Sequence, residues 1–393
     1  MTDTILVLNA GSSSIKFALY PAANTDETPL ISGKIEGIGR APDFRARDAQ
    51  GRDLVEDGLE TIDNSAGHGT LTTRLLEWLR YHDGDTRLVA AGHRVVHGGR
   101  TFTGPVVIDA GILEKLENLG SLAPLHQPHN LAAVKAISDW APGLPQVACF
   151  DTSFHRTQPR LAQLFALPRE LSDAGVIRYG FHGLSYQYIA DVLPDHLGAR
   201  ADGRVIIVHL GNGASMCAMK DRQSIATTMG FTALDGLMMG RRSGSLDPGV
   251  VLHLLQSEGL SADEIQKMLY RKSGLLGVSG FSNNMKVLQE SSDPHAQEAI
   301  DLFCYRAACE TGALVAALEG LDAMVFTAGI GENSAHVRRL ICARLGWLGV
   351  ELDQTANDAN GARISAPNSK VDILVVPTNE GAVIANATRA LTA

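Results

Sequence analysis

The sequence predicts an α/β fold of two duplicated domains, and three segments support this prediction. The segments LVLNAGSSSIKFALY (6–20) and RVIIVHLGNGASMCAMK (204–220) each read as an apolar strand, a turn of small residues and a second extended run. The segment AMVFTAGIGEN (323–333) reads as a strand that enters a glycine-rich turn. One plan repeated in distant parts of the chain indicates an internal duplication. The length of 393 residues also fits two domains, or three, better than one core.

The first turn is a candidate phosphate site. Ile15, Phe17 and Leu19 alternate with polar or small residues, so the run after the turn is a strand, and Lys16 faces away from its apolar side. The segment lacks the glycine spacing and the helical period of a Walker loop, which excludes the commonest phosphate loop. Small residues can still direct N–H groups and hydroxyls at an anion beside a lysine. A polar β-turn with a solvated lysine is the alternative, and this segment alone leaves both interpretations open.

Two helices are predicted around the third segment. Asn333 and Ser334 are residue types that cap helices, and we expect a helix from there through Leu345. The alanine- and leucine-rich run 299–318 predicts a long helix before the strand. We expect the apolar run 371–376 to form another strand near the carboxyl end of the chain.

The composition excludes several classes of function. A hydrophobic fraction of 45% and a charged fraction of 20% are typical of a folded protein, not a disordered one. The net charge of -9, from 34 basic and 43 acidic residues, predicts no general attraction to nucleic acid or to anionic membranes. Any anionic ligand must therefore be bound by local cations. No apolar run is long enough for a signal peptide core or a membrane span, and we expect a soluble protein that is not exported.

The cysteines indicate a reducing compartment. They are odd in number and lack CxxC spacing, which disfavours both a disulfide framework and a zinc ribbon. We therefore expect a cytoplasmic protein, with Cys304 and Cys309 as core residues of the long helix. The five cysteines are Cys149, Cys217, Cys304, Cys309 and Cys342.

These features resemble a known superfamily and, within it, one family. Two hairpin turns and a strand, glycine turn and helix resemble the actin, hexokinase and Hsp70 superfamily, in which two duplicated actin/ribonuclease H-like domains hold a nucleotide in a central inter-domain cleft. Short segments spread in order over nearly the whole chain resemble the acetate kinase family. They are NAGSSSIKF (9–17), GHRVVHGG (92–99), LAPLHQPHN (122–130), FDTSFH (150–155), YGFHGLS (179–185), HLGNGAS (209–215), MGFTALDGLMMGRRSGSLDPG (229–249), FTAGIGEN (326–333) and PTNEG (377–381).

The resemblance implies an activity and a domain organisation. The expected reaction is reversible phosphoryl transfer from ATP to acetate, giving ADP and acetyl phosphate, with Mg²⁺ or, in its place, Mn²⁺. The expected domains are residues 1–150 with a carboxyl-terminal helix over 381–393, and residues 151–380, which would bind the nucleotide and mediate dimerisation. A homodimer is also expected from the resemblance, with no nucleic acid or membrane as a partner.

Phosphoryl transfer needs mainly positioning and charge neutralisation, so the site should hold cations, hydrogen-bond donors and metal ligands. The resemblance implies that Arg94 and Arg242 flank the acyl phosphate and that His182 donates to the phosphoryl group. Guanidinium groups suit both positions, although a lone arginine is more often part of a surface ion pair. Asp151 follows an apolar run, so it should lie at the carboxyl end of a strand, where open sheets collect ligands.

The role of Asp151 needs a separate argument. The resemblance makes it catalytic, but acetate is already ionised at neutral pH and needs no general base. We expect Asp151 to orient Mg²⁺ or its waters, with proton handling as a second role and an aspartyl phosphate as a third. Asn9 and Glu380 would be the other residues on the metal side.

The resemblance also implies residues for the nucleotide and for the acyl group. The small apolar pocket for the acyl group would be lined by Val96, Leu125, Phe181 and Ala233, with His126 close by, although ordinary core packing explains these residues equally well. The expected nucleotide-binding residues are Ser12, Ser14, Lys16, His209, Leu210, Gly211, Asn212, Gly213, Asn284, Met285, Lys286, Gly329, Ile330, Gly331, Glu332 and Asn333.

The chain departs from the family pattern at two places that bear on specificity. Ala233 stands where a proline is usual, which should widen the acyl pocket, and one methylene changes discrimination by only about 1 to 3 kcal/mol. A propionate or butyrate kinase therefore remains an alternative. Asn284 and Lys286 replace the usual aspartate and arginine, which puts nucleotide affinity and base preference in doubt. A nucleotide-gated binding or chaperone-like protein is an alternative from another class.

Overall fold

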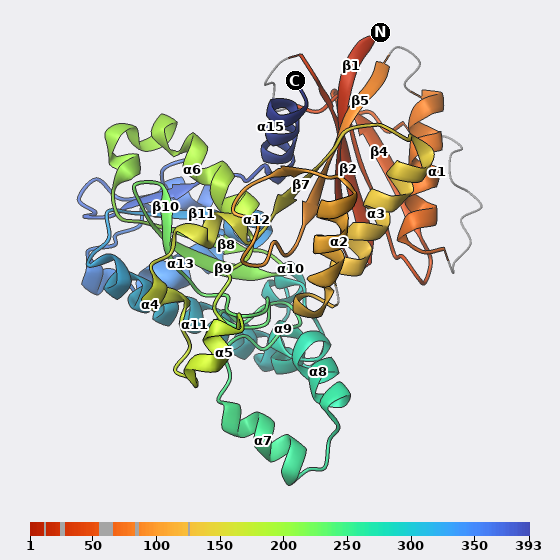
Figure 1. Cartoon of the computed structure of the whole chain (residues 1–393). Helices are drawn as coiled ribbons and strands as arrows, with labels where there is room; N and C mark the ends of the chain where they lie inside the picture. Colours follow the sequence, from red (N-terminus) through yellow and green to blue (C-terminus); the bar gives the residue numbers. More distant parts are fainter. Residues whose placement is uncertain (12, 24–27, 55–65, 83–85, 125) are drawn as a thin grey trace. The chain divides into compact units, whose positions relative to one another are not determined.

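The computed structural model describes residues 1–11, 13–23, 28–54, 66–82, 86–124 and 126–393 (Figure 1). The chain divides into two compact units. The first unit comprises Met1–Phe154 and Asn379–Ala393, and the second comprises His155–Thr378. The expected Ser12 and Leu125 lie outside the described residues.

The first unit is built on a mixed sheet. Over the described residues its strand order is β4-β3-β2-β1-β5-β7-β6, in which β1, β5 and β7 are parallel and the others antiparallel to their neighbours. The strands are β1 (Thr2–Ala10), β2 (Ser14–Pro21), β3 (Ile31–Glu36), β4 (Asp43–Asp48), β5 (Thr86–Val95), β6 (Val106–Val107) and β7 (Gln146–Phe150). The helices are α1 (His68–His82), α2 (Ala110–Asn118), η1 (Gly120–Leu122), α3 (Gln127–Trp140) and α15 (Glu380–Thr392).

The predicted first hairpin is confirmed. Strands β1 and β2 pair antiparallel from Thr4 opposite Pro21 to Ala10 opposite Ile15. Residues of β2 alternate as predicted, with Ile15 and Phe17 buried and Lys16 exposed between them.

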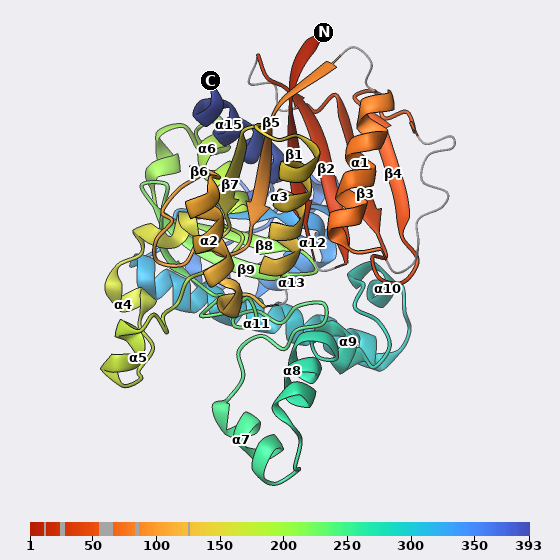
Figure 2. The same ribbon diagram turned by 45° about the vertical axis from the view of Figure 1, so that its right-hand side comes forward.

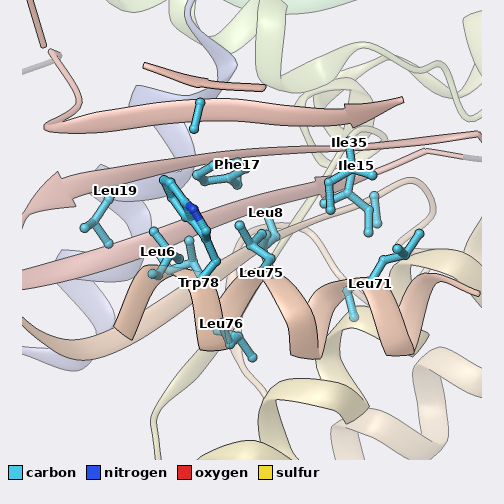
Figure 3. Close-up of a cluster of buried hydrophobic side chains, with 14 of the residues drawn as sticks. Leu6, Leu8, Ile15, Phe17, Leu19, Ile35, Leu71, Leu75, Leu76 and Trp78 are labelled. Carbon is cyan, nitrogen blue, oxygen red and sulfur yellow. The ribbon is translucent and has the colours of Figure 1, made fainter. Parts of the chain in front are cut away.

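Helices cover both faces of this sheet. Leu6 and Leu8 of β1 point to the face where Leu75 and Trp78 of α1 pack, and Figure 3 shows this cluster between the strands and the helix. Helix α15 packs on the other face against β5, where a Cβ on Gly92 would clash with the hydroxyl oxygen of Thr388. Only glycine permits this close approach of helix and strand.

The second unit contains a sheet with a related topology. Over the described residues its order is β10-β9-β8-β11-β12, with β8, β11 and β12 parallel. The strands are β8 (Val205–Leu210), β9 (Ala214–Lys220), β10 (Gln223–Thr227), β11 (Ala323–Thr327) and β12 (Asp372–Val375). The helices are α4 (Arg160–Gln163), α5 (Arg169–Asp173), α6 (Gly183–Leu197), α7 (Pro248–Gln256), α8 (Ala262–Arg271), α9 (Gly274–Ser279), α10 (Met285–Gln289), α11 (Pro294–Leu318), α12 (Ala328–Asn333), α13 (Ala335–Ala343) and α14 (Gln354–Asp358). Short 3₁₀ helices are η2 (Ser153–Thr157), which spans the junction between the units, η3 (Gly198–Asp202) and η4 (Gly346–Leu348).

Helices α6 and α11 lie on opposite faces of this second sheet. Neighbouring residues of a strand point to opposite faces, and in β9 the hydroxyl of Ser215 contacts Tyr186 of α6. The next residue, Met216, accepts a hydrogen bond from Thr311 of α11 through its sulfur, at 3.6 Å. Figure 2 allows both helices to be followed beside the strands of this unit.

Several sequence predictions in this unit hold, and two are wrong. The hairpin β8–β9 and the strand β11 form as predicted, and Ser334 caps α13 by accepting the N–H of Val337. The segment after β11 is not an open glycine-rich turn but the short helix α12. Cys304 is buried, whereas Cys309 is exposed, because five residues advance about 140° around a helix and place it near the opposite side.

Among the described residues, no helix combines the length and the apolar character needed to cross a bilayer.

Candidate active site

In the first unit, two of the predicted residues form a buried ion pair. Nε and Nη2 of Arg94 donate to the two carboxylate oxygens of Asp151, at 2.9 and 2.5 Å. The side chain of Asp151 is 2% exposed and that of Arg94 is 19% exposed. Asp151 directly follows β7, and Arg94 is the penultimate residue of the adjacent parallel strand β5. The carboxyl ends of neighbouring parallel strands therefore bring together two residues that the sequence separates by 57 positions.

Asn9 and Glu380 complete this group. The side-chain oxygen of Asn9, near the end of β1, accepts from Nη1 of Arg94 at 3.0 Å. Burial alone would lower the pKa of Arg94, but the negative charges of Asp151 and Glu380 outweigh it and raise the pKa above its ordinary value. The guanidinium is thus permanently charged and held by three hydrogen bonds in one orientation. Carboxylates and a side-chain amide are also the oxygen donors that Mg²⁺ prefers.

Other side chains fix the backbone around this group. The amide nitrogen of Asn130 donates to the carbonyl of Ala10 at 2.5 Å, and its oxygen accepts the N–H of Val96 at 3.0 Å. His68 donates from Nε2 to the carbonyl of Gly11 at 2.6 Å. These contacts anchor the first turn to the end of β5.

The remaining expected residues of the first unit lie at or near the turn or the strand ends. Val96 is buried beside Arg94, and His126 is the half-buried residue that precedes α3. Ser14 begins β2, and its carbonyl accepts the N–H of Gly11 at 2.8 Å. Lys16 is exposed on β2, with Asn9 as its partner across the hairpin.

In the second unit, His182 has an unusual backbone conformation. It precedes α6 with a φ of 60°, in the left-handed region that non-glycine residues rarely adopt. The preceding carbonyl, that of Phe181, accepts from Nε2 of the buried His155 at 2.9 Å. A strained residue of this kind persists only where its surroundings hold it, and such residues cluster at functional sites.

The His182 side chain is held by a serine and another imidazole. Its Nδ1 lies 2.8 Å from the hydroxyl of Ser215, and its ring stacks on that of His209 at a centroid distance of 4.2 Å. His209 forms a matching contact, from Nδ1 to the hydroxyl of Ser185 at 2.8 Å. Both Nδ1 atoms therefore contact a hydroxyl.

The Nε2 atom of His182 faces a glycine turn. A Cβ on Gly213 would lie 3.2 Å from this Nε2 and 3.7 Å from Nη2 of Arg242. Arg242 is oriented by a hydrogen bond from Nη1 to the carbonyl of Ala233, at 2.8 Å. The structure thus brings His182 and Arg242 to the same turn, while Phe181 and Ala233 supply backbone carbonyls around them.

An open pocket of about 650 Å³ lies within the second unit. This volume is in the usual range for small-molecule sites. Its lining includes residues expected from the sequence, namely Gly211, Asn212, Asn284, Met285, Lys286, Gly329, Ile330 and Asn333. It also includes Asn283, Gln289 and Ser334, which the sequence reasoning missed.

The other expected nucleotide residues do not line this pocket. His209 and Leu210 end the buried strand β8, and Gly213 lies beside His182. Gly331 is buried within α12, and the carboxylate of Glu332 turns back to the backbone.

Glu332 and Arg338 hold the two ends of α12. One carboxylate oxygen of Glu332 accepts the N–H groups of Ala328 at 2.7 Å and Thr378 at 3.1 Å. Ala328 has a φ of 64°, again in the left-handed region. The fully buried Arg338 donates to the carbonyls of Gly331 and Glu332 at 2.8 and 2.9 Å. Contacts with residues outside the helix therefore fix the conformation of a pocket wall.

Comparisons with known proteins agree over almost the whole chain. The sequence profile described as the Acetokinase family matches residues 4–386. The chain belongs to this family.

Relatives and solved structures of this family match the chain from end to end. A protein named acetate kinase from Rhodopseudomonas palustris is 54% identical over 98% of this chain and 97% of its own length. The crystal structure of a propionate kinase from Francisella tularensis has a TM-score of 0.91 at 37% identity, covering 99% of this chain and 100% of that one. The crystal structure of Porphyromonas gingivalis acetate kinase has a TM-score of 0.87 at 36% identity, covering 99% of both chains.

Sequence reasoning missed the residues that act through hydrogen bonds to the site. Ser215 and Asn130 both lie inside the segments that resemble the family, HLGNGAS and LAPLHQPHN. Their place in these segments could have marked them as site residues. Tyr186 and Arg338 lie outside those segments and act by hydrogen bonds, Tyr186 with the hydroxyl of Ser215 and Arg338 to the carbonyl of Gly331. Among the described residues, no group of three or more His, Cys, Asp or Glu side chains is arranged to hold a metal ion.

Proposed function

We propose that this chain catalyses reversible phosphoryl transfer from ATP to acetate, giving ADP and acetyl phosphate by direct in-line transfer. Membership of the acetokinase family supports the reaction class. The observation that carries the proposal is the Arg94 guanidinium, which Asp151 and Asn9 hold in one orientation at the carboxyl ends of β5, β7 and β1. A fixed, permanently charged guanidinium suits a carboxylate or an acyl phosphate.

The residues of the two units have distinct roles in this proposal. Arg94 binds the carboxylate of acetate and the developing acyl phosphate, and Arg242 binds the transferring phosphoryl group. His182 donates a hydrogen bond from Nε2 to that phosphoryl group and stabilises the charge that develops on it. We propose for Asp151 a main role other than the expected one of orienting Mg²⁺, because both of its oxygens accept hydrogen bonds from Arg94. Asp151 orients Arg94.

No proton must be removed from the nucleophile. Acetate is ionised at neutral pH, so an oxygen lone pair attacks the γ-phosphorus while the bond to the β,γ-bridging oxygen breaks. The electron pair of that bond leaves with ADP. This balance needs neither a general base nor an aspartyl phosphate at Asp151.

The pocket of the second unit binds the nucleoside part of ATP in this proposal. Its lining combines a glycine-rich wall at Gly329 with amide side chains, among them Asn283 and Asn333. The amide nitrogen of Asn283 donates to the side-chain oxygen of Asn212 at 3.1 Å, which links two parts of the wall. Lys286 supplies the positive charge, and its side chain is 82% exposed.

A divalent cation fits the first-unit group through its oxygen donors. Glu380 and Asn9, with Asp151, would hold Mg²⁺ largely through water, because Mg²⁺ keeps several waters and needs few direct protein ligands. When bound, the ion neutralises phosphate charge. Asp151 orients Arg94 by hydrogen bonds, whereas Glu380 acts on Arg94 through its charge, so removal of Glu380 should affect the metal requirement most.

Propionate is a second candidate substrate. The specific observation is Ala233, a small half-buried residue that stands where the family usually has proline. One of the similar solved structures is that of a propionate kinase. We expect acetate and propionate turnover to differ by about 10- to 200-fold at most, because one methylene contributes only about 1 to 3 kcal/mol.

We also propose that the protein is a cytoplasmic homodimer. Helix α7 carries no buried residue, and both Figure 1 and Figure 2 show it projecting from the second unit. Val250, Leu252 and Leu255 are 39%, 52% and 39% exposed, and the helix carries no Asp, Glu, Lys or Arg. A neutral apolar helix of this kind suits a second copy of the chain. Sedimentation tests both parts of this proposal: a monomeric wild type would contradict the dimer, and an unchanged dimer in a Leu252→Asp, Leu255→Asp variant would contradict the role of α7. The free thiols suit a reducing compartment.

An acyl-hydroxamate assay tests the proposed reaction. Purified enzyme is incubated with ATP and acetate, propionate or butyrate, with and without Mg²⁺, and acyl phosphate is trapped with hydroxylamine. The proposal predicts Mg²⁺-dependent acetyl hydroxamate. Absence of product with all three acids, from folded protein that binds ADP, would contradict it.

A further inference from the structure

A chain of three polar groups runs behind His182 in the second unit. The phenol oxygen of Tyr186 contacts the hydroxyl oxygen of Ser215 in a short hydrogen bond, and that hydroxyl lies 2.8 Å from Nδ1 of His182. Tyr186 and Ser215 are fully buried. Hydroxyl protons in such a dry environment must be donated to a partner, because an unsatisfied buried polar group is costly.

One arrangement of protons uses all three groups in series. Burial raises the pKa of Tyr186 well above its ordinary value, so its phenol remains protonated and can donate to Ser215. Ser215 can then donate its own proton to Nδ1 of His182. In a neutral imidazole an accepting Nδ1 leaves the proton on Nε2.

The surroundings of His182 favour the neutral imidazole. Nη2 of Arg242 and Nε2 of His182 both lie within 4 Å of the Cβ position of Gly213, so a cation is close to the ring. The ring also stacks on His209 at 4.2 Å. A guanidinium close by disfavours a second positive charge on His182.

We infer that Ser215, supported by Tyr186, is a positioning residue that keeps the proton of neutral His182 on Nε2, the atom that faces the glycine turn beside Arg242. This inference rests on the proposed function, in which Nε2 donates to the phosphoryl group. Without the serine hydroxyl, the imidazole would divide its population between two tautomers, and one of them presents a lone pair to an anion. The contact would then be repulsive.

The backbone of His182 supports the same orientation. His155 donates from Nε2 to the carbonyl of Phe181, and its Nδ1 lies 2.9 Å from the hydroxyl of Ser224. His182 is thus fixed through its preceding carbonyl and through its Nδ1. These two contacts leave Nε2 directed at Gly213.

Nitrogen NMR of the intact enzyme tests the inference without relying on activity. With ¹⁵N-labelled histidine, the signals of His182 are assigned by their loss in His182→Asn, and the protonated and unprotonated ring nitrogens have well-separated shifts. We expect Nε2 to be protonated in the wild type, and we expect the proton to shift partly to Nδ1 in Ser215→Ala. Protonation at Nδ1 in the wild type, or an unchanged tautomer in Ser215→Ala, would overturn the inference.

Kinetics provide the second readout. Ser215→Ala should lower kcat by about 10- to 100-fold while KM for ATP and acetate stays within about twofold, because only a transition-state contact is lost. Tyr186→Phe, which removes a single oxygen, should lower kcat by a smaller factor, and Ser215→Thr, which keeps the hydroxyl, should restore most of it. A rise in KM with unchanged kcat in both Ser215→Ala and Tyr186→Phe would overturn the inference.

The two proposals can fail separately. If His182→Asn turns over at the normal rate, the proposed role of His182 in phosphoryl transfer is wrong, while the tautomer measured by NMR still supports the positioning role of Ser215. If His182→Asn is inactive but the tautomer does not respond to Ser215→Ala, the positioning role is wrong and the proposed function stands.

Discussion

The two sheets of this protein share a topology but differ in what their strands carry. In the first unit the order β3-β2-β1-β5-β7 places a hairpin partner and an antiparallel strand on one side of β1 and two parallel strands on the other. In the second unit β10-β9-β8-β11-β12 repeats this order and these directions around β8. The predicted duplication therefore describes the strand order of both sheets.

The difference lies at the carboxyl ends of the parallel strands. In the first unit these ends carry the charged and amide side chains of Asn9, Arg94 and Asp151, which bond one another. In the second unit the ends of β8 and β11 lead into a glycine turn and the short helix α12, which help to line an open pocket. The same topology thus holds a fixed guanidinium in the first unit and helps to form an open pocket in the second. We interpret this as a division between acyl and nucleotide binding.

The largest effect should come from the charge in the first unit. Arg94→Ala should lower kcat/KM for acetate by a factor of about 10³ or more, because a charge-assisted contact to the reacting group is lost. It should also lower the free energy of unfolding by about 3 kcal/mol or more, since Asp151 keeps its charge in a buried position. Arg94→Lys, which cannot donate to both carboxylate oxygens and Asn9 together, should recover little activity. Near-normal turnover in Arg94→Ala would contradict the assignment.

The wall of the pocket in the second unit should respond differently. Glu332→Ala removes the acceptor of the Ala328 and Thr378 N–H groups, so α12 should lose its fixed position. We expect KM for ATP to rise about tenfold with kcat changed less than threefold, as for a loss of about 1 to 2 kcal/mol in binding. Glu332→Gln keeps an acceptor oxygen and serves as the matched control. If Glu332→Ala lowered kcat and left KM unchanged, α12 would not be a binding element.

Low pH should lower the free energy of unfolding through one buried histidine in each unit, and this effect is smaller than the two above. Burial lowers the pKa of His93 in the first unit and of His155 in the second to about 4, from an unfolded value near 6.5. The unfolded chain therefore binds more protons, and the free energy of unfolding should fall as the pH drops from about 6.5 through about 4. Each histidine contributes at most about 1.4 kcal/mol per pH unit. In denaturant unfolding, the free energy of unfolding of His93→Gln and of His155→Gln should depend less steeply on pH than that of the wild type. An unchanged pH dependence in both variants would contradict this account.

The smallest effect should come from the exposed rim of the pocket. The side chains of Lys286 and Glu290 are 82% and 65% exposed and form an i,i+4 pair at 3.9 Å. Lys286→Ala should change the melting temperature little, because exposed pairs contribute little to stability. We expect KM for ATP to rise about two- to fivefold, with a stronger effect at low salt. An effect on acetate KM instead would place Lys286 in another role.

Several strands and helices of this fold followed from local patterns, and the site residues did so only in part. The alternation around Phe17 predicted β2, and the apolar run before Asp151 predicted β7. The pairing of Arg94 with Asp151 could not be read from the sequence, because it depends on the register of two strands joined by a long connection. The prediction that Cys309 is a core residue is wrong because the five-residue spacing from Cys304 places it on another side of the helix.

The helix α12 shows the same limit. Its glycines favour a turn, but Glu332 and Arg338 supply hydrogen bonds to the backbone at both ends of the segment. These partners meet only in the folded unit, since Thr378 and Arg338 lie in other elements or loops of that unit. Local propensity was therefore overridden by tertiary contacts.

Calorimetric binding of ADP to two variants tests the division between the units most directly. Gly329 lines the pocket, and a Cβ there meets no atom within 4 Å, so Gly329→Trp should fold and fill the pocket. We predict that Gly329→Trp weakens ADP binding by about tenfold or more, while folded Arg94→Ala binds ADP within about threefold of the wild type and forms no acetyl phosphate. Wild-type ADP affinity in Gly329→Trp, or loss of ADP binding in Arg94→Ala, would contradict the account.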